Sequence, residues 1–297
     1  MRSVFFLAIV TALGLAPSTV PVPTRAAPAP DLQTRAPLDD VAVLNYALTL
    51  EHLENAFYTG ALARFDERAF ANAGLPASAR TRFAEIAAHE QTHVQLLQTV
   101  LGDKAVRPCE YFFPYSDPRS FAALSQVLEG VGVSAYIGAA AFIADKTYLR
   151  VAASILSTEA RHASYVQAAV NNLVPWSGAF DIPLDMTTVY SLARVFITSC
   201  PDANSILRVR PFPTLTVVTR DPKPGSKATL KFDIPRDLRN LYMVFFSGLE
   251  KKFARIEGRE VTIPAGLGGT VYGVVSKSAN STSDGDVVAG VAILQFD

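Results

Sequence analysis

The sequence predicts a multidomain α + β protein, in which a four-helix bundle with a short fifth helix precedes a small antiparallel β-sandwich. Two observations carry this prediction. Long segments within residues 38–203 repeat apolar side chains with a helical period, and four of them place a glutamate among those side chains. From about residue 205 the period gives way to short alternating runs separated by Gly, Pro, Asn and Asp, as in β-sandwiches.

Helices are expected over residues 39–65, 78–101, 118–143 and 146–172, with the fifth over 185–198. Residues 103–117 contain Pro108 and Pro114 and cannot be helical throughout. About fifteen extended residues reach roughly 50 Å, whereas a 24-residue helix is about 36 Å long. The connection can therefore run the length of the bundle and start the third helix parallel to the second, which is the long crossover of a ferritin-like bundle.

The β-sandwich is expected over residues 205–297, after the helical domain of residues 38–203. Its predicted strands are residues 214–219, 228–233, 241–247, 253–256, 261–263, 270–276 and 287–296. Seven short strands in about ninety residues are typical of an immunoglobulin or fibronectin type of sandwich.

The N-terminus has the pattern of a secretory signal. Arg2 precedes an apolar run over residues 4–15 that is too short to span a bilayer. We expect a signal peptide in residues 1–26, cleaved somewhere between 16 and 26, then a Pro/Ala-rich linker over 27–37. A buried N-terminal helix is the alternative, but no amphipathic period precedes Asp39. The mature protein is expected outside the cell or in the cell wall, without a membrane span.

Secretion would allow a disulfide between the two cysteines, Cys109 and Cys200. Asn280 begins an Asn-Ser-Thr sequon in a polar turn and is the expected glycosylation site. Lys+Arg and Asp+Glu both number 27, so the chain has no excess of positive charge that would indicate binding to nucleic acid. A cell-wall or protein partner for the β-sandwich is a hypothesis.

Two Glu-x-x-His pairs indicate a metal site. Residues three apart on a helix lie on one side of it, so Glu90 with His93 and Glu159 with His162 can each aim a carboxylate and an imidazole at one point. The other two long helices carry a glutamate each in the apolar stripe, Glu51 and Glu129. Four carboxylates and two imidazoles arranged in this way are the ligands of a two-metal site in a helical bundle.

The donor atoms predict the metal and the roles. Four carboxylates neutralise two divalent ions, and carboxylate-rich sites with one imidazole per ion suit two iron or two manganese ions. Glu51 and Glu159 are expected mainly as terminal ligands, Glu90 and Glu129 as bridges or near-bridges, and His93 and His162 as terminal nitrogen ligands. Glu54 is a second candidate on the first helix.

Two tyrosines repeat the internal symmetry, since Tyr58 and Tyr136 each follow a glutamate of the set by seven residues. They are interpreted either as packed core residues with hydrogen-bonded hydroxyls, or as residues near the metals that are partners of the ligands or redox-active. Of the remaining histidines, His52 is expected at the surface and His89 as a bystander.

The segment from His89 to His93 also has the His-Glu-x-x-His pattern of zinc proteases, with both histidines on zinc and Glu90 as the base. No third ligand follows at the metzincin spacing, and this interpretation leaves Glu159 and His162 unexplained. A scaffold without enzymatic activity, with a stress or cell-wall role, is a further alternative.

The motifs Leu50-Glu51-His52, His89-Glu90 through His93, and Leu128-Glu129-Gly130 through Tyr136 lie in order along residues 38–200. In them the chain resembles the ferritin-like family of secreted fungal stress-response and sexual-development proteins, which is related to plant desiccation-related proteins. The resemblance implies a ferritin-like fold with di-iron or di-manganese ligands at the six residues above. The expected function is redox chemistry with oxygen or peroxide, or a stress response. A β-domain after the bundle departs from cage-forming ferritins.

Overall fold

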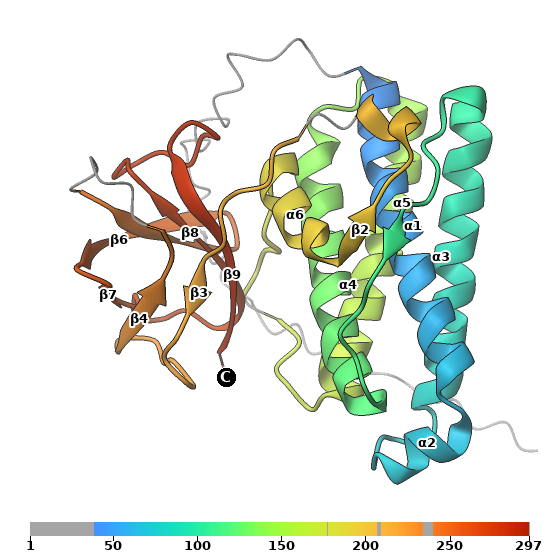
Figure 1. Ribbon diagram of the computed structural model, residues 1–297, viewed down its shortest axis with the longest axis horizontal. Helices are drawn as coiled ribbons and strands as arrows, with labels where there is room; N and C mark the ends of the chain where they lie inside the picture. The colour runs from blue at the N-terminus through green and yellow to red at the C-terminus, as the bar shows by residue number, and fades with distance from the viewer. Residues whose placement is uncertain (1–38, 177, 207–208, 234–239, 297) are drawn as a thin grey trace, which may run out of the picture. The chain divides into compact units, whose positions relative to one another are not determined.

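A computed structural model describes residues 39–176, 178–206, 209–233 and 240–296 of the chain. The predicted signal peptide and linker, residues 1–37, lie outside the described residues. Four long helices form the first part of the structure (Figure 1), as the helical period predicts. They are α1 (Asp40–Arg64), α3 (Ala79–Leu101), α4 (Pro118–Ala140) and α5 (Lys146–Tyr165), and α5 continues as the π-helical turn Val166–Val170.

Local side-chain chemistry sets where these helices begin. Asp39, Asp117 and Asp145 each accept hydrogen bonds from backbone N–H groups in the first turn of α1, α4 and α5. The fifth helix is shorter than expected, with α6 spanning Met186–Ala193 before a 3-10 turn at Arg194–Phe196. A short helix, α2 (Glu67–Asn72), was not predicted.

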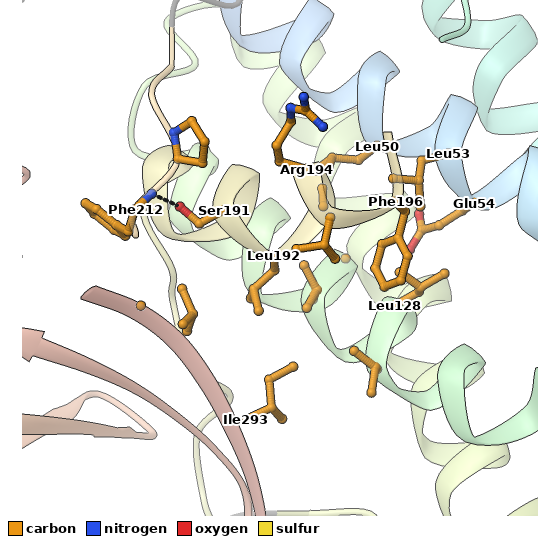
Figure 2. Close-up of a pocket in the computed structure, with 18 of the residues that line it drawn as sticks. Leu50, Leu53, Glu54, Leu128, Ser191, Leu192, Arg194, Phe196, Phe212 and Ile293 are labelled. Carbon is orange, nitrogen blue, oxygen red and sulfur yellow. Dashed lines mark hydrogen bonds between the residues drawn. The ribbon is translucent and has the colours of Figure 1, made fainter. Parts of the chain in front are cut away.

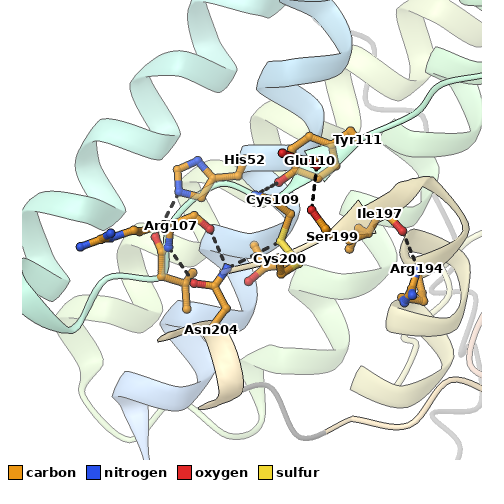
Figure 3. The surroundings of a disulfide bond; sticks show 12 residues. His52, Arg107, Cys109, Glu110, Tyr111, Arg194, Ile197, Ser199, Cys200 and Asn204 are labelled. Carbon is orange, nitrogen blue, oxygen red and sulfur yellow. Dashed lines mark hydrogen bonds between the residues drawn. A yellow bond between two sulfur atoms is a disulfide. The ribbon is translucent and has the colours of Figure 1, made fainter. Parts of the chain in front are cut away.

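The segment between α3 and α4 crosses the length of the bundle, and α3 and α4 point the same way (Figure 1). Within it, β1 (Glu110–Tyr111) pairs with β2 (Ile197–Ser199), which follows α6. The disulfide Cys109–Cys200 joins the ends of these two strands (Figure 3). The crossover and the disulfide are therefore as predicted, and the disulfide ties the crossover to the end of the helical region.

All seven strands expected after residue 205 are present and antiparallel. They are β3 (Thr216–Val217), β4 (Lys227–Lys231), β5 (Tyr242–Ser247), β6 (Glu250–Glu257), β7 (Glu260–Thr262), β8 (Gly269–Ser276) and β9 (Val287–Phe296). They form one continuous sheet in the order β3-β4-β7-β6-β5-β8-β9, rather than the two separate sheets of an immunoglobulin-type sandwich. Its two edges are linked, since Gly290 N donates to the carbonyl oxygen of Pro213, just before β3.

Strand β5 shows why the sheet stays on the bundle. Met243 and Phe245 point into the core enclosed by the sheet, whereas Val244 and Phe246 belong to the core that the bundle forms. Alternate side chains of a strand face opposite sides, so the continuous apolar run of residues 243–246 in β5 reflects burial on both faces.

Helix α4 is the one helix among the described residues that is long and apolar enough to cross a membrane by length and composition. Within its most apolar stretch, 61% of the residues are buried inside the protein. Its composition is thus accounted for by its place in the bundle core, where it also carries the buried Glu129.

Candidate metal centre

The bundle brings the six predicted ligands together in its interior. Glu51 comes from α1, Glu90 and His93 from α3, Glu129 from α4, and Glu159 and His162 from α5. All six are buried, and three of the carboxylates, Glu90, Glu129 and Glu159, are 0% exposed. On α3, α4 and α5 the ligands lie on the apolar side that the helix turns inward, whereas α1 is buried all round over residues 43–54 and Glu51 lies within that stretch.

The ligand atoms form two groups, each with its atoms within 4.8 Å of one another. The first contains Glu51, Glu90, His93 and Glu159, and the second Glu90, Glu129, Glu159 and His162. Glu90 and Glu159 are therefore shared. This corrects the roles expected from the sequence: Glu159 takes the shared position expected for Glu129, because α3 and α5 each place their glutamate between the two histidine rings.

The distances show the same two-fold pattern. His93 Nδ1 lies 3.2 Å from Glu51 Oε2, 3.3 Å from Glu90 Oε2 and 3.2 Å from Glu159 Oε1. His162 Nδ1 lies 3.2 Å from Glu90 Oε1, 3.3 Å from Glu129 Oε2 and 3.8 Å from Glu159 Oε2. Each imidazole thus faces one carboxylate of its own group and the two that are shared.

Several of these atoms are buried without a hydrogen-bond partner among the described residues: Glu90 Oε1, Glu129 Oε2, both oxygens of Glu159, and His162 Nδ1. Such unsatisfied atoms are rare in folded proteins and call for an ion or another partner. Oxygen-rich groups with a single nitrogen suit iron or manganese. The residues present therefore fit bound metal ions.

The metal-free centre compensates its charge with protons. Burial raises the pKa of Glu51 to about 8 and raises that of Glu129 well above its usual range. Burial alone would lower the pKa of His93 and His162, but contacts with the glutamates raise both to about 12. Burial would likewise raise the pKa of Glu159, yet the two histidines lower it to about 2. Ions entering the centre would displace the histidine protons.

The two tyrosines contact the centre in a crossed arrangement. The hydroxyl of Tyr58, on α1, donates to Glu129 Oε1 on α4, and that of Tyr136, on α4, donates to Glu51 Oε1 on α1. Burial, followed by the nearby carboxylate charge, raises the pKa of both tyrosines well above the usual value. Both tyrosines are buried in the core, as the first interpretation expects. Their hydroxyls also donate hydrogen bonds to two glutamates of the centre, as expected for partners of the ligands.

Glu54 also faces the centre. It is 5% exposed, and burial followed by the charge of Glu159 raises its pKa well above the usual range. The sequence signal was its spacing, because Glu54 follows Glu51 by three residues, as each histidine follows its glutamate.

Two histidines differ from expectation. His52 is 5% exposed rather than at the surface, because the crossover covers it and its Nε2 lies 3.3 Å from the carbonyl oxygen of Val106 (Figure 3). His89 is exposed, but its Nδ1 lies 2.9 Å from Nε2 of His162. His89 belongs to neither of the two groups of ligand atoms. The geometry therefore contradicts the zinc-protease interpretation, in which His89 and His93 would share one ion.

Comparison with known proteins supports this fold. A family model described as a ferritin-like domain matches residues 39–172. The helical bundle is ferritin-like. Over 180 residues the chain is 26% identical to Protein rds1 of Schizosaccharomyces pombe. That alignment covers 61% of this chain and 44% of the relative, so the chain spans less than half of that protein. The ferritin-like match contains all six predicted ligands and ends before the sheet begins.

Proposed function

We propose that this chain is a secreted protein that holds two iron or two manganese ions in its ferritin-like bundle and uses them in redox chemistry with oxygen or peroxide. The observation that carries the proposal is the pair of ligand groups that share Glu90 and Glu159. Iron or manganese ions held there would supply one-electron and oxygen chemistry.

Each residue of the centre has a role in this proposal. Glu51 and His93 would help to hold one ion, Glu129 and His162 the other, and Glu90 and Glu159 would contribute to both sites. Four carboxylates carry four negative charges, which two divalent ions neutralise. Tyr58 and Tyr136 would fix the outer oxygens of Glu129 and Glu51, as hydrogen-bonding partners of metal ligands commonly do.

Secretion is supported by the Cys109–Cys200 disulfide, since such bonds persist mainly in oxidising compartments. Asn280 is exposed on the sheet side, as a glycosylated asparagine must be. A role in stress response rests on the sequence resemblance alone.

Elemental analysis of the purified full chain tests the metal centre. We expect two iron or manganese ions per chain, almost none in Glu90→Ala, and one in Glu129→Ala, because Glu90 belongs to both groups and Glu129 to one. Glu85→Ala is the matched control, as Glu85 is an exposed glutamate on the same helix as Glu90. A wild-type chain without iron or manganese would refute the proposal.

The reaction is tested on the loaded protein by two assays, oxygen uptake with ferrous iron and oxygen release from peroxide. Activity in either assay that disappears in Glu90→Ala and persists in Glu85→Ala would support redox chemistry at this centre. If the loaded protein is inactive in both assays, the chain binds metal but does not carry out this redox chemistry.

A further inference from the structure

A cavity of about 430 Å³ lies where α1, α4, the end of α6 and β9 come together (Figure 2). Its size falls in the range of small-molecule binding sites, about 300 to 1,000 Å³. Side chains from all four elements line it, including Leu53, Leu128, Leu192, Phe196 and Ile293. The family match ends at residue 172, so much of the lining lies outside the matched residues.

The cavity reaches the metal centre at Glu54 and Gly132, which both line it. A Cβ atom added to Gly132 would lie 3.2 Å from Glu54 Oε1 and 3.5 Å from Glu159 Oε2. Both carboxylates therefore border the space that the glycine leaves open. Glu159 is one of the two shared glutamates, so a molecule in the cavity would be separated from the centre by little more than Glu54.

The lining shows what kind of molecule would fit. Most of it is aliphatic or aromatic. The Ser191 hydroxyl is occupied, since it donates to the carbonyl oxygen of Thr187 and accepts from Phe212 N at 2.9 Å. The Arg194 guanidinium donates to the carbonyl oxygen of Ile197.

The Glu54 carboxyl, by contrast, has no hydrogen-bond partner in the described part of the chain, and Figure 2 shows it pointing toward the cavity. A buried carboxyl without a partner at the end of an apolar cavity is a place for a ligand's polar group. An anionic ligand is disfavoured, because its charge would leave water for a lining that is mostly apolar.

We propose that this cavity binds a small, uncharged, mostly apolar organic molecule, whose single hydroxyl or carbonyl group forms a hydrogen bond with Glu54 beside the metal centre. The molecule would be the organic substrate of the centre, and in that respect the inference rests on the proposed function. Leu192 and Ile293, from α6 and β9, would enclose its apolar part.

Binding is tested with 1-naphthol, which is apolar, uncharged at neutral pH and carries one hydroxyl. Equilibrium dialysis against the full chain should show saturable binding at least tenfold tighter than that of naphthalene-1-sulfonate, the anion of the same ring system. Ile293→Trp and Leu192→Trp each fill the cavity from a different wall and should weaken 1-naphthol binding at least tenfold. Val218→Trp, at an exposed valine away from the cavity, should not.

The Glu54 contact has its own test. Glu54→Leu should remove the preference for 1-naphthol over naphthalene, and Glu54→Gln, which keeps hydrogen-bonding atoms in place, should retain it. Equal binding of 1-naphthol and the sulfonate, or undiminished binding in both cavity-filling variants, would overturn the proposal. Melting temperatures of the tryptophan variants show that they fold.

Proximity to the centre is measured on the manganese-loaded chain, because Mn²⁺ accelerates the relaxation of nearby protons. The protons of bound 1-naphthol should relax faster than with the metal-free chain, and this effect should vanish in Ile293→Trp. Metal content is determined separately. Naphthol binding by a chain that takes up neither iron nor manganese would refute the metal proposal alone, whereas metal uptake without naphthol binding would refute only the cavity proposal.

Discussion

The exposed His89 is hydrogen-bonded to the buried His162, with 2.9 Å between His89 Nδ1 and His162 Nε2. The other nitrogen of His162, Nδ1, faces Glu90 and Glu129. Partners on the outer nitrogen of a metal-binding histidine fix the orientation of its ring. In the proposed metal centre His89 would therefore position His162, and it links that ligand group to the surface.

Removing His89 should weaken one ion site selectively. In His89→Ala we expect the affinity for one of the two ions to fall about tenfold, since lost partners of metal ligands typically cost 10- to 100-fold. Stepwise metal titration separates the two ions. His89→Gln, whose amide can still contact His162, should restore part of the affinity, and Gln91→Ala, at an exposed neighbour on α3, should change nothing. Equal weakening of both ions would contradict a positioning role.

The metal-free protein should lose stability as pH rises from 5 to 8. The folded chain keeps protons on Glu51, with a pKa of about 8, and on His93 and His162, with pKa values of about 12, whereas the unfolded chain releases them near their ordinary values of 4.5 and 6.5. The folded state thus binds more protons in this window, so the free energy of unfolding decreases with pH. Glu159, with its pKa lowered to about 2, has the opposite effect, but only below its ordinary value of 4.5.

Thermal melts of chelator-treated protein at pH 5, 6, 7 and 8 check this expectation. Glu51→Gln should make the decline shallower, because it removes one of the groups that cause it. Metal binding should strengthen over the same range, since ions must displace the histidine protons. A melting temperature of metal-free protein that rises between pH 5 and 8 would show that the buried centre is not protonated.

Gly138→Ala should destabilise the fold. A Cβ at Gly138 would lie 1.8 Å from the carbonyl oxygen of Leu184, and that backbone cannot move freely because Leu184 N donates to the carbonyl oxygen of Ser134 at 3.1 Å. Overpacking of this kind costs about 1 to 3 kcal/mol. Gly285→Ala is the control, since a Cβ there meets nothing within 4 Å. Urea denaturation measures both variants, and equal midpoints would contradict the close approach of α4 to Leu184.

Removing the disulfide should lower stability without emptying the metal centre. Cys109 and Cys200 are 91 residues apart, so their bond shortens a long loop of the unfolded chain and contributes about 4 to 5 kcal/mol by loop entropy. We expect Cys109→Ala/Cys200→Ala to unfold at lower urea concentration, and reduced wild-type protein to behave in the same way. A loss below about 1 kcal/mol would mean that the crossover is held by its packing alone.

Much of the centre could be predicted from local geometry. The relation between Glu90 and His93 is set by the helix itself, as is that between Glu159 and His162, so neither depends on how the helices pack. The parallel start of α4 followed from the length of the crossover. The strands could be predicted from alternating apolar and polar residues. The exception is β5, whose continuous apolar run is explained only by burial on both faces.

What the sequence left open depends on how separate elements meet. Glu159 rather than Glu129 is shared between the ligand groups because of where α5 lies against α3, and no spacing within one helix encodes that distance. His52 is covered by a crossover that begins fifty residues later, and His89 finds its partner on another helix.

The sequence by itself thus determined which residues supply the carboxylates and imidazoles, because helical periodicity is local. Only the tertiary structure decided how these ligands divide between two groups, that the tyrosines hold them crosswise, and that Glu54 opens onto a cavity bounded by β9. Those features arise from packing between elements far apart in the chain, where a shift in one helix changes which atoms meet.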